Sequence, residues 1–288
     1  MANKTGKDKR ATTWSELLRV PPGPVDLASY DTRATPGFNG DKQDGREALT
    51  ALGADLSDLQ ERLYAHGRSG GHRRLLLVVQ GMDTSGKGGV MRHVVGQLDP
   101  QGVRIKAFKA PTAEERRRGF LWRIRQALPL PGEVGVFDRS HYEDVLIARV
   151  NKLARPPVIE RRYESINVFE AELAASGCDV IKVMLHISSA EQKERLAARL
   201  DDPAKHWKYN PGDVDERIKW PEYQRAYELA LERCNTDLVP WHVVPADRKW
   251  YRNLAISHLV LEHLAAMNLG WPVADFDVAS EQKRLQAT

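Results

Sequence analysis

The chain has 288 residues, of which 42% are hydrophobic and 28% are charged, and its formal net charge is +4. A chain of this length buries a substantial core, and it contains neither an unbroken apolar run of membrane-spanning length nor a signal peptide. We therefore expect one large α/β domain in a soluble, cytoplasmic protein. Cys178 and Cys234 lack a metal-type spacing, and we expect both to be reduced.

Residues 1–45 are predicted to form an N-terminal arm. They are rich in Pro, Gly, Lys and Asp and show no hydrophobic period, which indicates an extended segment partly ordered against the body. A single domain then covers residues 46–288. It begins with a predicted amphipathic helix from Arg46 to His66, in which leucines recur at intervals of three and four, and a cluster of glycines ends this helix.

Five apolar runs are predicted as strands. Helical patterns separate them, and this β-α alternation is typical of a parallel sheet covered by crossover helices on both faces. The first run is apolar on both of its own faces, which favours a central position in the sheet. The five runs are residues 75–79, 103–108, 133–137, 179–187 and 238–244.

The first strand leads into QGMDTSGKGGV, residues 80–90, which has the spacing of a phosphate-binding loop. Glycines in such a loop let backbone N–H groups converge on phosphate oxygens, the following helix adds a favourable dipole, and the lysine neutralises charge. A tight strand-to-helix turn with a solvated lysine is the alternative. The predicted phosphate contacts are Gly86, Lys87, Gly88 and Gly89.

Two carboxylates are candidates for metal ligands. Gly88 stands where a Ser or Thr ordinarily ligates magnesium, so Asp83 within the loop is our candidate for the replacement oxygen. Asp138 ends the strand run of VGVFDRSHYED, and functional groups in parallel sheets gather at the carboxyl ends of strands. We expect Asp83 and Asp138 to share Mg²⁺, with Mn²⁺ as a substitute. The alternative is that Asp138 caps a helix with Arg139 as its partner.

Residues 104–125 carry eight basic and two acidic side chains, a local charge of +6 that requires an anionic partner. The stretch PTAEERRRGFLWRIRQAL predicts one helix, capped by Thr112 and Glu115. A solvated charged helix face is the alternative for any single arginine. The predicted phosphate contacts in this segment are Lys106, Lys109, Arg117, Arg118 and Arg123.

Residues 188–220 are predicted to form a helical lid, called the lid segment below. Ser188 and Glu191 have the spacing of a helix cap, and Arg195 and Arg199 lie one turn apart on the same helix face. Prolines then frame a segment able to close over phosphates and exclude water. A surface helix with internal ion pairs is the alternative.

Together, GMDTSGKGG, FKAPTAEERRRGFLWR, FDRSHYEDVL, DPAKHWKYNPGD and WPEYQRAY resemble the polyphosphate kinase 2 family over about residues 46–272. The resemblance implies a P-loop kinase fold similar to thymidylate kinase, with a mobile lid. It also implies Mg²⁺-dependent transfer of phosphoryl groups between inorganic polyphosphate and nucleotides.

By the same resemblance, Asp83 and Asp138 would hold magnesium, and Lys87 with Arg139 would neutralise the reacting phosphates. Glu143 of RSHYE fits the subgroup that phosphorylates both AMP and ADP, although many of its members carry Asn in place of Asp138 and GKDG in place of GKGG. Family members often form dimers or tetramers, and we expect a homo-oligomer. The lid cations implied are Arg195, Arg199, Lys205 and Lys208.

We therefore expect direct, reversible in-line transfer from polyphosphate to AMP or ADP, with His141 as a scaffold residue rather than a phosphohistidine. An ATP-dependent nucleotide or small-molecule kinase is the alternative enzyme. A basic protein that only stores polyphosphate or binds nucleic acid is disfavoured, because two carboxylates in an anion site repel the ligand unless a metal is present. We expect neither a nucleic-acid nor a membrane partner.

Overall fold

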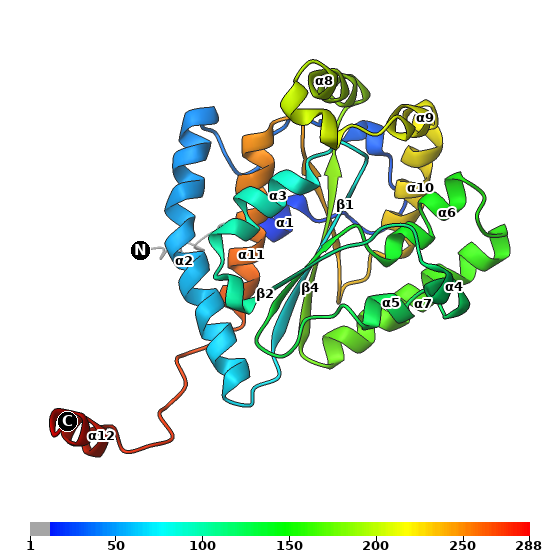
Figure 1. Ribbon diagram of the computed structural model, residues 1–288. Coiled ribbons are helices and arrows are strands. Elements are labelled where there is room, and N and C mark those ends of the chain that lie inside the picture. Colours follow the sequence, from blue (N-terminus) through cyan, green and yellow to red (C-terminus); the bar gives the residue numbers. More distant parts are fainter. Residues whose placement is uncertain (1–11) are drawn as a thin grey trace, which may run out of the picture.

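The computed structural model describes residues 12–288, and the first eleven residues of the predicted arm lie outside this range. A five-stranded sheet stands at the centre of the molecule, with helices on both of its faces (Figure 1). The expected α/β fold is confirmed.

The sheet is entirely parallel, with strand order β2-β3-β1-β4-β5. The first strand lies at its centre, as its apolar faces predicted. Asp138 pairs with Val79, so the carboxyl ends of β1 and β3 lie side by side. The strands are β1 (Arg74–Gly81), β2 (Val103–Ala107), β3 (Val134–Asp138), β4 (Cys178–His186) and β5 (Trp241–Pro245).

Alternate residues of β1 enter two separate hydrophobic clusters, because successive side chains of a strand point to opposite faces. Leu75 and Leu77 join the cluster on one face, and Leu76 and Val78 join the cluster on the other. The first cluster is completed by α2 (Lys42–Arg68), α3 (Lys87–His93) and α11 (Lys249–Ala266). The second is completed by α5 (Trp122–Arg125), α6 (Ile147–Val150), α7 (Pro156–Ala175) and α10 (Trp220–Arg233).

The described part of the N-terminal arm covers the edge of β5. Arg19 forms an antiparallel bridge with His242, and the Val20 N–H donates to the Trp241 carbonyl at 2.8 Å. A covered edge is protected against pairing with other chains. This segment holds α1 (Trp14–Leu18) and the 3₁₀ turn η1 (Leu27–Ser29), and α2 begins slightly before its predicted start, at Lys42, where Asp41 caps it.

The basic segment differs from its prediction as one continuous helix. Thr112 caps a first short helix, α4 (Ala113–Arg117), through the expected reciprocal bonds with Glu115. The chain then leaves the helical conformation at Arg118 and resumes it only in α5. The physical reason is packing: α4 buries no residue, whereas α5 buries Ile124, and Gly119 between them weakens a continuous helix.

The lid segment lies at the carboxyl ends of the strands, above the phosphate-type loop (Figure 1). Ser188 caps its first helix as expected, since its Oγ accepts from the Glu191 N–H at 3.1 Å. The segment comprises α8 (Ser189–Leu200), the 3₁₀ segment η5 (Pro203–Lys208) and α9 (Gly212–Ile218). The remaining 3₁₀ turns are η2 (Val95–Gln97), η3 (Pro100–Gly102) and η4 (His141–Asp144).

The C-terminal helix α12 (Val278–Gln286) stands apart from the body in Figure 1 and buries none of its residues. Cys178 and Cys234 are free and buried. Among residues 12–288, no helix combines the length and apolar character needed to cross a membrane.

Buried His242 is expected to make stability pH-dependent. Its Nδ1 lies 3.2 Å from the Lys182 carbonyl oxygen, and burial lowers its pKa from 6.5 to about 4. Between these values the unfolded chain takes up a proton that the folded chain does not. Stability therefore falls as the pH drops through this window, by about 3 kcal/mol in all. Urea unfolding between neutral and acidic pH should show a shallower decline for His242→Gln than for wild type; parallel curves would contradict the assignment.

Candidate active site

The loop between β1 and α3 is shaped by its glycines. Gly86 adopts a φ of 111°, which favours glycine, and a Cβ there would lie 1.7 Å from Arg252 Nη1. Within residues 12–288, the N–H groups of Gly86, Lys87 and Gly88 donate no hydrogen bond, whereas the Gly89 N–H donates to the Gly86 carbonyl. Three neighbouring free donors are what an anion-binding loop requires.

Lys87 folds back over this loop. Its Nζ donates to the Gly81 carbonyl at 2.8 Å and lies 3.3 Å from the Met82 carbonyl. Burial lowers the pKa of Lys87, and the nearby Asp83 carboxylate offsets this only in part. The ammonium is therefore held inside the site by main-chain oxygens.

An ion pair joins the ends of β1 and β3. Arg139 Nη2 lies 2.7 Å from Asp83 Oδ1, and Arg139 adopts a φ of 62°, a conformation that a residue with a side chain holds only when its surroundings enforce it. Burial raises the pKa of Asp83, but the charges of Lys87 and Arg139 outweigh it and hold this pKa below its usual value. Asp83 is therefore ionised at neutral pH. Half-buried Asp138, at the end of β3, lies near Lys87 and Arg139.

Glu143 belongs to the same cluster of charges. In the amide orientation that satisfies both neighbours, the Gln80 nitrogen donates to Glu143 Oε1 at 3.0 Å and the Gln80 oxygen accepts from Ser140 Oγ at 2.9 Å. Burial raises the pKa of Glu143, although Arg139 and Lys87 act in the opposite direction. The structure thus brings together Asp83, Lys87, Asp138, Arg139 and Glu143.

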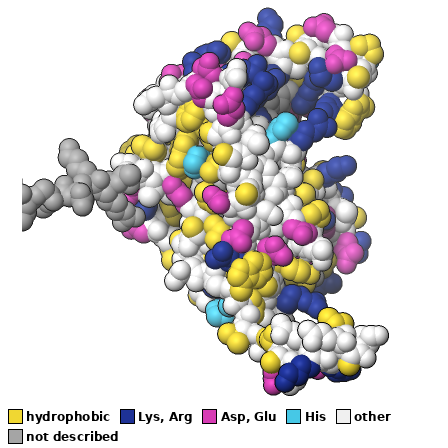
Figure 2. All heavy atoms as spheres, turned by 90° about the vertical axis from the view of Figure 1, so that its left-hand side faces the viewer, with side chains coloured by type: hydrophobic (Ala, Val, Ile, Leu, Met, Phe, Trp, Pro, Cys, Tyr) yellow, Lys and Arg dark blue, Asp and Glu magenta, His cyan; other side chains and the backbone are white. Residues whose placement is uncertain are grey.

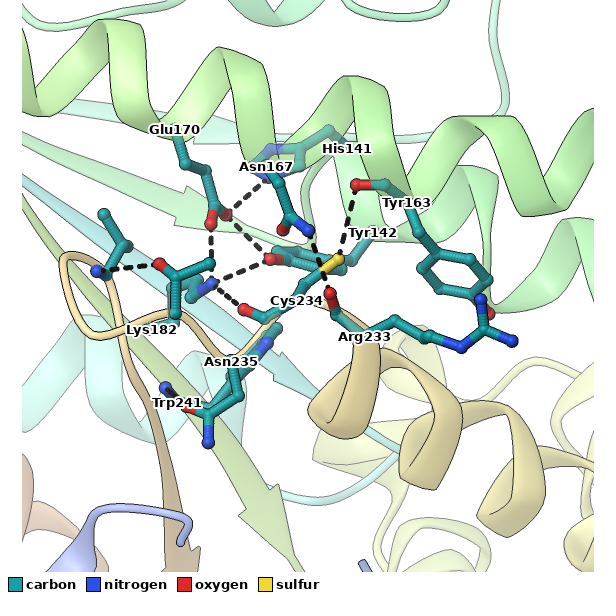
Figure 3. A network of polar contacts seen from close by, with 12 residues as sticks. His141, Tyr142, Tyr163, Asn167, Glu170, Lys182, Arg233, Cys234, Asn235 and Trp241 are labelled. Carbon is teal, nitrogen blue, oxygen red and sulfur yellow. Dashed lines mark hydrogen bonds and ion pairs between the residues drawn. The ribbon is translucent and has the colours of Figure 1, made fainter. Parts of the chain in front are cut away.

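A buried polar network includes His141 and Tyr142, which precede Glu143 in η4 (Figure 3). The Lys182 ammonium donates to Glu170 Oε2 and to the Cys234 carbonyl, each at 2.6 Å, and the Tyr142 hydroxyl donates to Glu170 Oε1 at 2.7 Å. His141 Nε2 lies 3.2 Å from the same carboxylate, and His141 is fully buried. These bonds anchor η4 to α7 and β4, as expected for His141 as a scaffold residue.

Arg195 lies beneath the phosphate-type loop rather than on its open side. The Nη atoms of its buried guanidinium donate to four main-chain carbonyls at distances between 2.7 and 3.1 Å, those of Thr84, Ser85, Ala246 and Asp247. The guanidinium also pairs with Glu191 at 2.7 Å.

The other lid cations lie nearer the surface. Arg199 Nη1 donates to the Lys208 carbonyl at 2.9 Å and lies 3.3 Å from Asp213 Oδ2. Lys205 pairs with Asp202 at 2.7 Å, and Lys208 lies over the exposed ring of Trp207. Figure 2 shows Lys and Arg side chains gathered around a hollow in the upper part of the molecule, the part formed by the lid segment in Figure 1.

The basic segment divides into exposed and buried cations. Lys106, Lys109, Arg117 and Arg118 are exposed. Arg123 is buried, donates to the Lys109 carbonyl at 2.8 Å, and lies 3.6 Å from Asp144. Arg123 therefore fixes the segment to the body.

Several residues of the site have no counterpart in the sequence predictions. Arg252 packs under the loop, and Gln192 Nε2 donates to the Asp83 carbonyl at 3.1 Å. Glu170 and Lys182 contact His141 and Tyr142 and so hold η4 in place. A signal existed for Lys182, because a lysine in the middle of the apolar run DVIKVMLHI requires a buried anionic partner. No sequence pattern indicates that Arg252 and Gln192 contact the loop, because both are distant from it along the chain.

A parallel sheet whose central strand leads through a phosphate-type loop into a helix, with an aspartate ending the neighbouring strand, defines a P-loop kinase-like phosphotransferase. The family model described as Polyphosphate kinase 2 (PPK2) matches residues 39–270. The chain therefore belongs to the polyphosphate kinase 2 family.

Solved and curated relatives agree with this membership. The crystal structure of Polyphosphate Kinase 2 from Arthrobacter aurescens TC1 is 52% identical and matches with a TM-score of 0.94, covering 96% of this chain and 97% of that one. The AMP/ADP-polyphosphate phosphotransferase of Meiothermus ruber is 43% identical over 88% of this chain and 93% of its own length. The ADP-polyphosphate phosphotransferase of Rhodopseudomonas palustris is 38% identical over 86% and 88%, respectively.

Proposed function

We propose that this protein transfers phosphoryl groups from inorganic polyphosphate to AMP and ADP, forming ADP and ATP. The observation that carries the proposal is the meeting of Lys87, the Asp83–Arg139 pair and Glu143 at the ends of β1 and β3. Phosphoryl transfer needs positioning and charge neutralisation more than covalent chemistry, and this cluster supplies both. The Meiothermus ruber relative, named for AMP and ADP as well as polyphosphate, supports the choice of acceptors.

The reaction proceeds by direct in-line transfer and is reversible. Lys87 and Arg139 neutralise the oxygens of the moving group, while the free N–H groups of the loop bind the non-reacting phosphate oxygens. Direct transfer is supported by the burial of His141, whose Nε2 lies against Glu170 and is closed to substrate. Glu143 lies beside the cluster and contributes to the nucleotide site.

Asp83 and Asp138 would hold the Mg²⁺ ion of this reaction. Asp83 is ionised, and no atom lies within 4 Å of the Cβ that Gly88 lacks, so space is open where a Ser or Thr hydroxyl ordinarily sits. Residues 12–288 contain no group of three or more metal-ligating side chains. The two carboxylates still suit Mg²⁺, which takes its other ligands from water and phosphate. When bound, Mg²⁺ or Mn²⁺ neutralises charge on the phosphate oxygens.

Cations outside the central cluster would form a track for the polyphosphate chain. The exposed basic residues of segment 104–125 and the lid cations Arg199, Lys205 and Lys208 carry charges that are compensated only in part. Arg123 and Arg195 add positive charge from buried positions. A linear polyanion requires several cations along a line rather than one pocket.

The decisive experiment supplies purified protein with Mg²⁺, long-chain polyphosphate and either AMP or ADP, without ATP, and separates the nucleotides by chromatography. We expect ATP from ADP, and ADP followed by ATP from AMP. If neither nucleotide reacts while added ATP supports phosphorylation of a nucleotide, the protein is the alternative ATP-dependent kinase.

Asp83→Asn is expected to shift the Mg²⁺ dependence of the reaction to higher concentration, because the amide oxygen carries no charge with which to attract a divalent cation. Rates should be measured over a Mg²⁺ titration at fixed polyphosphate and ADP. Asp215→Asn, an exposed residue of α9, is the matched control and should leave the titration unchanged. A wild-type titration curve for Asp83→Asn would remove Asp83 from the metal site.

The protein is also proposed to form a dimer or tetramer, as the family resemblance implies. Size-exclusion chromatography with light scattering tests this, and a monomer at assay concentrations would contradict it.

A further inference from the structure

Arg252, near the start of α11, carries a buried charge. Its side chain is 2% exposed. Its donors reach Asn253 Oδ1 at 2.8 and 3.2 Å and the Ser85 carbonyl at 3.3 Å. Within residues 12–288 it forms no ion pair with a carboxylate, although burying an ionised group ordinarily requires such a partner.

A second cation, Arg195, increases the electrostatic cost of burying the charge of Arg252. Arg195 donates to the same Ser85 carbonyl at 3.0 Å, so two guanidinium groups meet at one loop oxygen. Burial and the charge of Arg195 lower the pKa of Arg252 to about 9, and Arg252 is therefore still charged at neutral pH. A charge retained in such surroundings needs a reason other than the stability of the fold.

The loop is shaped around this guanidinium. A Cβ at Gly86 would lie 1.7 Å from Arg252 Nη1, and a Cβ at Gly89 would lie 2.4 Å from Nη2. A Cβ at Gly88, by contrast, would meet no atom within 4 Å. Two of the three glycines around Lys87 thus leave room for Arg252, and the third does not face it.

The contact with Ser85 also orients a peptide group. All described peptide bonds are trans, so a carbonyl and the following N–H point in opposite directions. The Ser85 carbonyl is directed toward Arg195 and Arg252, and the Gly86 N–H, which donates to no group among the described residues, therefore points away from them.

We propose that Arg252 is a positioning residue for phosphate binding, whose uncompensated charge lies beneath the loop and attracts the phosphate chain through the Ser85–Gly86 peptide. It does not touch the substrate. It raises the positive potential of the loop from behind and fixes the direction of one N–H donor. The inference rests on the proposed phosphate-binding role of the loop.

The test compares Arg252→Gln, which keeps a donor but removes the charge, with Arg252→Lys, which keeps the charge. Arg284→Gln in the exposed helix α12 is the matched control. The probe is inorganic tripolyphosphate, titrated calorimetrically into the full chain. We expect R252Q to bind about tenfold more weakly, R252K to stay within about threefold of wild type, and R284Q to be unchanged.

Two further readouts separate this role from a merely structural one. A buried charge is screened little by salt, so the ratio of wild-type to R252Q affinity should persist between about 50 and about 300 mM salt. In polyphosphate kinetics, the KM of R252Q should rise about tenfold while kcat changes less than about threefold, because the charge acts on bound substrate and transition state alike.

Wild-type affinity in R252Q, or equal weakening in R252Q and R252K, overturns the inference. If wild-type protein does not bind tripolyphosphate, the proposed function is overturned together with the inference. If wild type binds it and R252Q binds it equally well, only the inference is overturned. If R252Q does not fold, Arg252→Met provides the uncharged comparison. Failure of both to fold assigns Arg252 to the structure and overturns the proposal.

Discussion

Replacing Lys87 with alanine is expected to lower kcat at least about 100-fold with polyphosphate as donor. Lys87 is the ammonium held within the loop, beside the Asp83–Arg139 pair, and in the proposed reaction its charge neutralises the moving phosphoryl group. Initial rates of ATP formation from ADP at saturating substrates measure the effect. Since burial lowers the pKa of Lys87, the fold gains little from this charge, and the thermal midpoint should change little.

The control for this variant is Lys283→Ala, which removes an equal charge from the exposed helix α12. It should retain wild-type kcat. Near-normal turnover of Lys87→Ala in a folded sample would show that phosphoryl transfer occurs elsewhere in the molecule.

Lys182→Met is expected to lower the free energy of unfolding by about 3–5 kcal/mol, because it leaves the Glu170 carboxylate buried without its cation. Lys182 and Glu170 have side chains 0% and 1% exposed, and their charged atoms lie 2.6 Å apart (Figure 3). Burial raises the pKa of Glu170, but Lys182 and His141 reverse this and hold it below its usual value, so the carboxylate is charged. Urea unfolding at neutral pH measures the loss.

An exposed ion pair that links α5 to α7 supplies a matched control. Arg125 and Glu172 also lie 2.6 Å apart, but their side chains are 47% and 51% exposed. Arg125→Met should therefore cost less than about 1 kcal/mol. Adding Glu170→Gln to Lys182→Met removes the unpaired charge and should recover part of the loss. Equal losses in Lys182→Met and Arg125→Met would contradict the argument from burial.

The sequence predicted the parts of the molecule that depend on local pattern. The run before Gly81 is apolar on both faces, which correctly indicated the central strand, and the strand-end position of Asp138 indicated the edge where it meets the loop. The breadth of the resemblance to the polyphosphate kinase 2 family then identified the protein class.

The sequence does not indicate which side chains are buried, because packing between distant segments decides it. Arg123 and Arg195 resemble the other arginines of their segments, yet both are buried against main-chain carbonyls. An arginine is buried when main-chain carbonyls approach its guanidinium and accept its hydrogen bonds. Such carbonyls can come from distant parts of the chain, so the local sequence does not indicate which arginine they reach. The break between α4 and α5 likewise depends on which helix has a core to pack against.

Arg139 pairs with Asp83, and Lys87 pairs with loop carbonyls. In the proposed function, a phosphate chain that binds to these two cations replaces the contacts that they already make. A single small anion offers too little to replace both sets of contacts, whereas a chain of linked phosphates replaces them together. We therefore expect the site to bind small monovalent anions weakly. The affinity of the site for polyphosphate should also fall less steeply with ionic strength than the number of cations implies. The reason is that Arg139 and Lys87 are paired within the protein, and not with mobile counter-ions, before substrate binds.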